Sequence, residues 1–208
     1  VSLSAKQFGL FTYEGGSDSV TVTDYPEDAI GDVKIPSEID GKPVTEIGRQ
    51  AFFKCSSLTS ITIPDSVTEI GDLAFGFCRS LTSIIIPDNV TTLGYIAFRF
   101  CSNLTSVIIP NSVTSIRQET FQGCSSLKSV TIPNSVTTIG WNAFFRCSSL
   151  TSVTISDSVT TIGYQAFADC SSLAKATFLG HAPTFGRNSP FSPGPSSLSV
   201  FAGSAPDF

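Results

Sequence analysis

Six cysteines are the residues of this sequence whose number and spacing most directly suggest chemistry. They stand 23 residues apart, at Cys55, Cys78, Cys101, Cys124, Cys147 and Cys170. Six cysteines can pair into a disulfide framework, and thiolates also bind zinc, but the sequence has no paired Cys or His ligand spacing. Because equal spacing puts each cysteine at the same site of a repeat, we expect a column of buried free thiols that donate weak hydrogen bonds to neighbouring turns. Disulfides between adjacent repeats are the alternative interpretation, and metal binding is the weakest one.

Signatures of an enzyme are nearly absent from the rest of the sequence. The one histidine, His181, lies in a Gly-His-Ala-Pro segment, and no nucleophile or carboxylate motif accompanies it. An acidic group near the N-terminus has ligands suited to calcium but does not match the EF-hand spacing: Asp24, Glu27, Asp28 and Asp32. We interpret His181 as a turn residue and the acids as a solvated cap. We therefore predict no enzyme, with no catalytic residue, no metal site and no cofactor.

Composition and charge exclude several classes of protein. The chain has 208 residues, of which 41% are hydrophobic and 14% are charged, and this is typical of a packed, folded protein. Its net charge is -5 and its 12 Lys and Arg residues are scattered singly, so nucleic acid is not an expected partner. The apolar runs are far shorter than the roughly 20 residues that cross a bilayer, so we expect no membrane span. The chain contains no Met and starts at Val1, which indicates a processed or trimmed chain.

A repeat of 23 residues organises the middle of the chain. Phenylalanines follow the same period as the cysteines, at Phe52, Phe75, Phe98, Phe121, Phe144 and Phe167. A fixed period in the range of about 20 to 50 residues is typical of stacked units, none of which can bury its apolar face alone. The sequence therefore predicts a repeat solenoid, in which each 23-residue turn is called a rung below.

One rung can be divided into elements from its residue pattern. The segment from Leu58 to Ile63 has the Leu-x-x-Leu-x-Leu spacing of a strand with one buried face, and Pro64 ends it because proline has no N–H to donate. The segment from Val67 to Ile70 predicts a second short strand, Gly71 a change of direction, and Asp72 to Phe77 one or two helical turns. We expect an α/β solenoid, curved, with a parallel β-sheet on its concave face and short helices or turns on its convex face.

The two ends of the chain predict caps. The segments from Phe8 to Tyr13 and from Val20 to Thr23 flank "EGGSDS", a pattern that predicts a hairpin covering the open end of the first rung. Pro, Gly and Ser dominate residues 186 to 197, which predicts a loop. The expected domains are an N-terminal β cap at 1–35, the leucine-rich repeats at 36–178, and a C-terminal cap and tail at 179–208.

The repeat resembles a known family. Its pattern, Cys-x-x-Leu-x-x-Ile-x-Ile-Pro-x-x-Val-x-x-Ile-Gly-x-x-Ala-Phe, is similar to the BspA-like (Treponema pallidum type) leucine-rich repeat over about residues 30 to 180. The segment from Gly31 to Phe52 resembles the family's first repeat, and the segments Phe178 to Phe185 and Leu198 to Ala205 resemble its C-terminal cap. The resemblance implies a secreted or cell-surface protein whose commonest role is adhesion or binding to the extracellular matrix.

Positions that vary between the chain's own copies indicate where a partner binds. Two columns in the predicted helix segment vary most, the first from Arg49 to Tyr164 and the second from Lys54 to Asp169. In and beside these columns stand bulky apolar residues where polar ones are expected: Phe77, Tyr95, Ile96, Phe100, Trp141, Phe145 and Tyr164. The alternative is that these side chains pack flat against one another and are half-buried. A second candidate patch is Ile85 with Ile108 on the predicted concave face.

These observations favour a non-catalytic repeat domain. We expect it to mediate adhesion, or to bind an extracellular or cell-surface protein or glycan, through an extended solenoid surface. The candidate binding residues are Tyr95, Trp141, Tyr164, Phe77, Phe100, Phe145, Ile85 and Ile108. The alternative is a structural scaffold subunit that packs its apolar flank in a larger assembly or against a second copy of itself.

Overall fold

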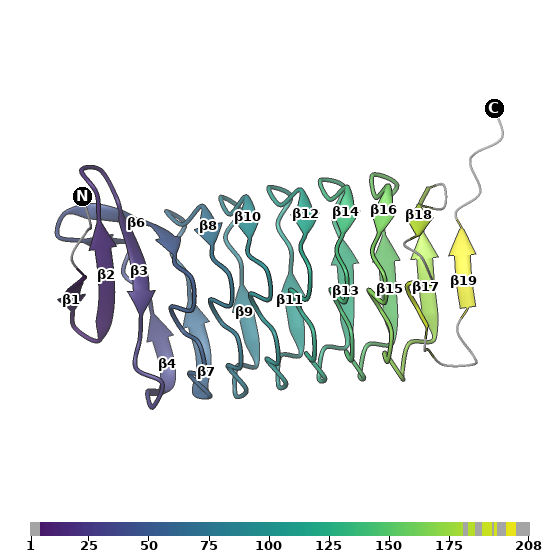
Figure 1. The fold of residues 1–208 in the computed structure, drawn as a ribbon, viewed down its shortest axis with the longest axis horizontal. Coiled ribbons are helices and arrows are strands. Elements are labelled where there is room, and N and C mark those ends of the chain that lie inside the picture. The colour runs from purple at the N-terminus through teal and green to yellow at the C-terminus, as the bar shows by residue number, and fades with distance from the viewer. Residues whose placement is uncertain (1–4, 181–182, 186–188, 193, 195–198, 203–208) are drawn as a thin grey trace.

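The computed structural model describes residues 5–180, 183–185, 189–192, 194 and 199–202, and His181 lies outside these residues. The chain winds into an elongated solenoid whose rungs stand side by side from the N-terminal to the C-terminal end (Figure 1). The row of rungs is close to straight in this view. Within the described part of the chain, no helix long and apolar enough to cross a membrane is present.

The predicted N-terminal hairpin is present and covers the first rung. Strand β1 (Lys6–Phe8) pairs antiparallel with β2 (Phe11–Gly15), which in turn pairs antiparallel with β3 (Val20–Asp24). Strand β3 then runs parallel to β6 (Lys42–Ile47), against which β5 (Glu38–Ile39) forms a small antiparallel pair. The antiparallel strands therefore close an end at which the first rung would otherwise expose its core.

The first strand of each rung forms what we call the long-strand face. One sheet has the order β11-β9-β7-β4 and a second has the order β13-β15-β17-β19, and all of these neighbours are parallel. The strands are β4 (Ile30–Lys34), β7 (Ser57–Thr62), β9 (Ser83–Ile85), β11 (Ser106–Ile108), β13 (Ser129–Ile132), β15 (Ser152–Ile155), β17 (Lys175–Phe178) and β19 (Ser199–Ala202). The predicted parallel sheet of a leucine-rich-repeat solenoid is thus confirmed.

A second column of shorter strands forms another face of each rung. These strands are β8 (Glu69–Ile70), β10 (Thr92–Leu93), β12 (Ser115–Ile116), β14 (Thr138–Ile139), β16 (Thr161–Ile162) and β18 (Thr184–Phe185). They pair in parallel as β6-β8-β10 and as β12-β14-β16-β18, so the column is interrupted between β10 and β12.

Arg117 explains this interruption. In the other rungs its position is a glycine whose N–H donates to the rung before, as Gly94 does to the Ile70 carbonyl at 2.7 Å. A Cβ atom on Gly71 would lie 2.8 Å from the backbone nitrogen of Arg49, which is closer than real Cβ atoms come. Arg117 carries such a Cβ atom, and among the described residues its N–H makes no bond of this kind to Leu93. One side chain therefore separates two rungs that otherwise follow the same plan.

A column of stacked phenylalanine rings forms the centre of the core. From Phe52 to Phe167 each ring lies 5.1–5.3 Å from the next, with interplanar angles of 4–17°, and all six side chains are buried. Tyr25 covers the first ring at 5.2 Å and Phe191 covers the last at 5.5 Å. The prediction of a buried Phe column is confirmed, and the two flanking rings continue the stack beyond the repeats at both ends.

The prediction of short helices on the convex face is wrong, and turns form there instead. Each rung has two residues in the left-handed region, with φ between 53° and 73°, at Gln50 and Lys54, Leu73 and Phe77, Ile96 and Phe100, Glu119 and Gly123, Asn142 and Arg146, and Gln165 and Asp169. A right-handed helix cannot contain such residues. The amides instead alternate: Phe53 N–H donates to the Gln50 carbonyl at 2.9 Å, while Phe52 N–H donates to the Ala74 carbonyl of the next rung at 2.8 Å. We call this surface of successive turns the turn face.

Candidate functional site

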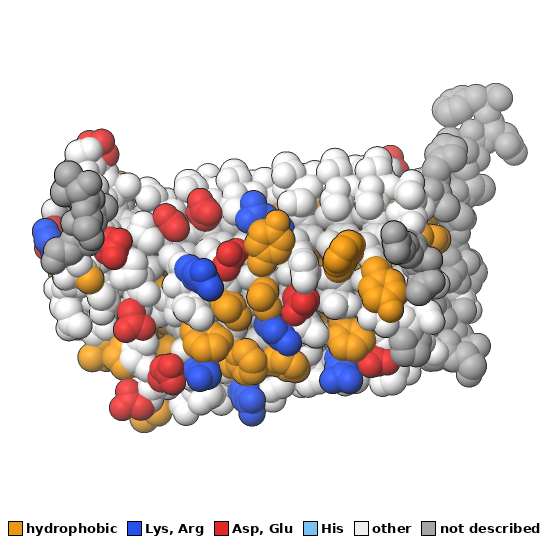
Figure 2. Space-filling view, in the orientation of Figure 1, with side chains coloured by type: hydrophobic (Ala, Val, Ile, Leu, Met, Phe, Trp, Pro, Cys, Tyr) orange, Lys and Arg blue, Asp and Glu red, His pale blue; other side chains and the backbone are white. Residues whose placement is uncertain are grey.

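Three exposed aromatic side chains lie along the turn face at one equivalent position of their rungs. Tyr95 is 49% exposed, Trp141 is 61% exposed and Tyr164 is 36% exposed, and we call these three residues the aromatic column. Each stands directly before a residue with positive φ, where the turn directs its side chain outward. Figure 2 shows this side of the molecule, on which hydrophobic side chains gather over the middle rungs with Lys and Arg side chains among them.

Neighbouring residues hold the aromatic column in place. The guanidinium carbon of Arg117 lies 5.2 Å from the centre of the Tyr95 ring, which is within the range of a cation–π contact. The indole of Trp141 leans toward the next rung, where a Cβ atom on Gly163 would lie only 2.6 Å from its Cδ1 atom. The rings are therefore exposed on one side and supported by the rigid repeat on the other.

The second group of predicted binding residues packs more deeply. Phe77, Phe100 and Phe145 are partly buried, and the Phe77 ring lies 5.6 Å from Phe53 and 5.1 Å from Phe100. Arginines cover their outer surfaces, with guanidinium carbons 5.0–5.8 Å from the rings: Arg79 on Phe77, Arg99 on Phe100 and Arg146 on Phe145. This arrangement matches the half-buried packing that the sequence left open as the alternative, with a cationic outer layer that the sequence did not indicate.

Ile85 and Ile108 lie on a different face from the aromatic column. They are 73% and 71% exposed and stand directly opposite each other in the register of β9 and β11. Their strand neighbours Ile84 and Val107 point into the core, as the alternation of a strand requires. A hollow of about 380 Å³ lies beside Ile108, between β11 and β13. The two isoleucines form the apolar patch that the sequence predicts, on the long-strand face.

A feature that the sequence analysis missed runs along the border between the turn face and the cysteines. A hollow of about 530 Å³ is lined by Arg79, Phe100, Ser102, Gly123, Ser125, Arg146, Ser148 and Asp169. Arg79 also lines an adjoining hollow of about 560 Å³, together with Glu27, Asp28, Lys54, Ser56 and Phe77. We call the two hollows together the edge groove. The sequence held one signal for it, since the residue after each cysteine is Ser in every rung except at Arg79.

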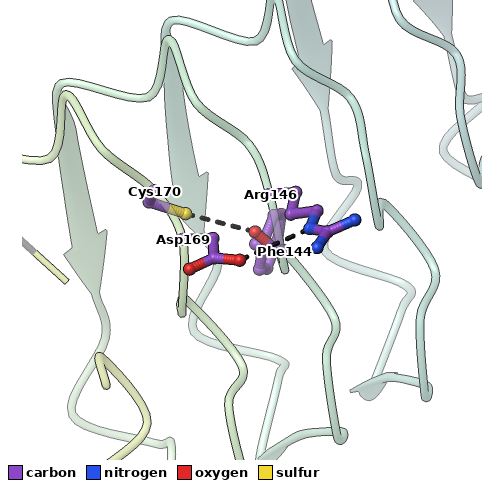
Figure 3. Close-up of polar contacts among 4 residues, drawn as sticks. All are labelled: Phe144, Arg146, Asp169 and Cys170. Atoms are coloured by element: carbon purple, nitrogen blue, oxygen red, sulfur yellow. Dashed lines mark hydrogen bonds and ion pairs between the residues drawn. The ribbon is translucent and has the colours of Figure 1, made fainter. Parts of the chain in front are cut away.

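The six cysteines are buried free thiols, as predicted. From Cys78 onward each thiol donates to the carbonyl of the phenylalanine 26 residues before it, at 3.1–3.3 Å, as Cys170 does to Phe144 (Figure 3). Cys55 has no such rung before it, and its thiol lies near the carbonyl oxygens of Tyr25 and Pro26 at 3.7 and 3.5 Å. Burial raises the pKa of Cys124 to about 12, so this thiol is neutral and unreactive at neutral pH.

The N-terminal acids do not converge on one point. Asp32 accepts hydrogen bonds from Thr59 at 2.8 Å and from Ser60 at 2.7 Å, and these bonds lower the pKa of its carboxyl group. Glu27 and Asp28 are exposed and line the edge groove instead. Among the described residues, no group of three His, Cys, Asp or Glu side chains is placed to hold a metal ion.

Solved structures of leucine-rich-repeat proteins resemble this chain. The T. pallidum leucine-rich-repeat protein is 35% identical, with a TM-score of 0.78 over 88% of this chain and 86% of that chain. A leucine-rich cell surface protein from Faecalibacterium prausnitzii is 24% identical, with a TM-score of 0.58 over 97% of this chain and 77% of that one. A leucine-rich-repeat protein from Eubacterium ventriosum is 25% identical, with a TM-score of 0.66 over 92% of this chain and 48% of that one.

Comparison with protein families gives the same result over most of the chain. A search of curated protein sequences found no match. Residues 32–189 match the family of the BspA type leucine-rich repeat region in six copies. The match spans the stacked Phe and Cys columns, which are the features that the 23-residue period requires. The chain therefore belongs to the BspA-type leucine-rich-repeat family.

Proposed function

We propose that this chain is a non-catalytic binding module of a secreted or cell-surface protein, and that it binds an extracellular or cell-surface protein through the aromatic column. The observation that carries the proposal is the exposure of Tyr95, Trp141 and Tyr164 in one line on a rigid scaffold. Tyr, Trp and Arg dominate the energetics of protein interfaces, and Arg117 lies against Tyr95 within the same surface. Such rings lose little conformational entropy on binding because neighbouring rungs already hold them.

The proposed location outside the cell is supported by the family and by one relative. The Faecalibacterium prausnitzii protein with the same fold is described as a cell surface protein. The described residues supply no cluster of metal-ligating side chains, and the six thiols are buried as structural elements. An adhesive role, in which several rungs contact one partner, uses the extended and repetitive surface that this solenoid presents.

The experiment is a binding screen against extracellular matrix proteins and cell-surface glycoproteins with two matched variants. The first variant replaces Tyr95, Trp141 and Tyr164 by Gln, which is the residue that this chain itself carries at the equivalent Gln118. The second replaces Ile85 and Ile108 by Thr, which stands at the equivalent Thr131 and Thr154. Both sets of substitutions occur naturally in sister rungs, so both variants are expected to melt like the unmodified protein.

The two variants separate the candidate surfaces. Loss of a bound partner in the Gln variant alone would support the aromatic column. Loss in the Thr variant alone would assign binding to the long-strand face and overturn the proposed site. A bound partner that both variants retain would also overturn it.

A scaffold role is the second candidate, and the exposed Ile85 and Ile108 pair favours it. Two adjacent isoleucines in register on a flat sheet are a surface that a second copy or a permanent subunit can cover. Sedimentation at increasing protein concentration tests this role. Self-association that the Thr variant abolishes would support the scaffold, and a monomer at all concentrations would exclude assembly from this chain alone.

A further inference from the structure

We propose that the edge groove binds a short acidic oligosaccharide, at a site separate from the aromatic column. This inference does not depend on the proposed protein partner, because the groove lies on the other side of the turn residues, next to the cysteines. Three features of the groove define the ligand: exposed cations, hydroxyl groups with free acceptor sites, and an apolar ring surface.

Two arginines supply the positive charge. Arg79 and Arg146 both line the groove and both are exposed, and they stand three rungs apart along it. Neighbouring rungs repeat at 5.1–5.3 Å, as the stacked phenylalanine rings show, so the two cations are spaced for an extended ligand rather than for a single ion. Arg146 is paired with Asp169 at 3.3 Å through its Nε atom (Figure 3), and this contact leaves its terminal nitrogens to donate to a carboxylate or sulfate.

Serine hydroxyls line the groove between the two arginines. The Ser125 hydroxyl donates to the Ser102 carbonyl at 3.2 Å, and the Ser148 hydroxyl donates to the Ser125 carbonyl at 3.3 Å. Each hydroxyl has one donor and two acceptor lone pairs. Because the donors are used within the ladder, these serines can only accept further hydrogen bonds. Sugar hydroxyl groups are the matching donors.

The Phe100 ring adds an apolar surface to the same hollow. It lies across Gly123, which has no side chain to cover it, and both residues line the groove between Arg79 and Arg146. The C–H face of a pyranose ring packs on such a surface. The combination of ring, acceptors and cations therefore fits a sugar that carries an acidic group better than it fits a simple anion.

The groove is less suited to an acidic peptide or to nucleic acid. An extended peptide binds most strongly by pairing with a free backbone edge, but here the backbone groups already bond between rungs, as Ser126 N–H does to the Ser102 carbonyl at 3.1 Å. Acidic side chains bound the basic stretch at both ends, with Glu27 and Asp28 at one end and Asp169 at the other. These acids repel a long polyphosphate, so we infer a short ligand.

The test measures binding of three hexamers by titration calorimetry. Hyaluronan hexasaccharide carries carboxylates, chitohexaose is a neutral sugar of the same length, and hexaglutamate is an acidic peptide. We expect the hyaluronan hexasaccharide to bind in a salt-sensitive manner and the other two to bind at least about tenfold more weakly, since charge-assisted hydrogen bonds and sugar hydroxyls act together only in the first. No binding of the hyaluronan hexasaccharide, or equal binding of either other hexamer, would overturn the proposal.

Matched variants locate the site. Arg79→Ser restores the residue that the other rungs carry after cysteine, and with Arg146→Gln it removes two positive charges from the groove. We expect this double variant to weaken hyaluronan binding at least about tenfold, the effect of losing one charge-assisted bond or more. Arg49→Gln with Arg117→Gln removes the same charge from the turn face and should leave binding unchanged. Equal weakening in both variants would reduce the effect to net charge and overturn the site.

The variant with Gln at positions 95, 141 and 164 keeps this inference distinct from the proposed function. It should bind the hyaluronan hexasaccharide like the unmodified protein, even where it loses a protein partner. Loss of the sugar in that variant would place the sugar on the aromatic column and overturn the edge groove as its site.

Discussion

The ring of Phe100 occupies the space that a side chain on Gly123 would need. A Cβ atom built on Gly123 would lie 2.6 Å from Phe100 Cε1, and the backbone of Gly123 has a φ of +73°. In the other rungs, bulky or charged residues fill the position of Gly123, as Phe77 and Arg146 do. Steric exclusion and backbone conformation therefore both favour glycine at this one rung.

Gly123→Ala is expected to lower the free energy of unfolding by about 1 to 3 kcal/mol. The positive φ alone disfavours a Cβ atom by about 1 kcal/mol, and the Phe100 ring must also move. Urea denaturation of the purified protein measures this loss. In a Phe100→Ala background the same substitution should cost clearly less, because the steric conflict is gone. An equal cost in both backgrounds would contradict the role of the ring.

Phe98→Ala is expected to cost about 3 to 5 kcal/mol as a core truncation. Phe98 is buried and stacked between Phe75 and Phe121, each 5.3 Å away. The removal leaves a cavity between two rungs whose backbones cannot close it, since hydrogen bonds on either side hold their spacing. Chemical denaturation checks the value, and a loss below about 1 kcal/mol would show that the stack contributes little.

Stability is expected to fall as the pH rises above about 9. Burial raises the pKa of Cys124 from 9.0 to about 12, and that of Cys55 also to about 12. Below pH 9 the folded and unfolded states both keep these protons, so stability does not depend on them. Between pH 9 and 12 only the unfolded state loses them, which favours unfolding by about 1.4 kcal/mol per pH unit for each such thiol. Urea titrations from pH 7 to 10.5 measure the slope.

Cys124→Ala provides the control for this alkaline transition. Removing one titrating thiol should flatten the slope above pH 9 while leaving the order of the rungs intact. The same thiols should resist maleimide labelling at pH 7.5 until the protein unfolds, because all six are buried. A slope that is unchanged in the variant would assign the pH dependence to other groups.

Arg117→Gly is expected to restore pairing between β10 and β12. Without a Cβ atom, residue 117 can approach the preceding rung and donate to the Leu93 carbonyl, as Gly94 and Gly140 do to Ile70 and Ile116 at 2.7 Å. Amide hydrogen exchange at residues 114–117 should then slow. Arg117→Ala keeps the Cβ atom and should not slow it. Equal protection in both variants would show that the side chain does not cause the interruption.

Much of the fold could be predicted from the spacing of residues alone. A period of 23 residues places Phe98 and Cys101 at equivalent sites of every rung, and only a stack of rungs can bury all copies of such a column. The hydrogen bond from each thiol to a neighbouring turn also followed from that reasoning, and the structure confirms it. The candidate binding surfaces and the domain boundaries stay predictions.

The turn face could not be predicted in the same way. Leu73, Phe77 and Ile96 have positive φ, yet none is glycine, so the sequence carried no local signal against a helix. Bonds to the next rung hold these residues in that conformation, as Leu73 N–H donates to the Tyr95 carbonyl at 3.0 Å. Such bonds exist only once the rungs have stacked.

The sequence by itself determined the solenoid, its buried columns and its family, because periodic burial is written into residue type and spacing. Only the tertiary structure decided which variable side chains stay exposed. Tyr95 and Phe100 vary alike between copies, but Phe100 packs against the neighbouring rungs and Tyr95 faces outward. Likewise, Arg79 and Arg146 meet in one groove only because three rungs stack between them. Exposure and neighbourhood depend on contacts between rungs, and a single repeat does not contain them.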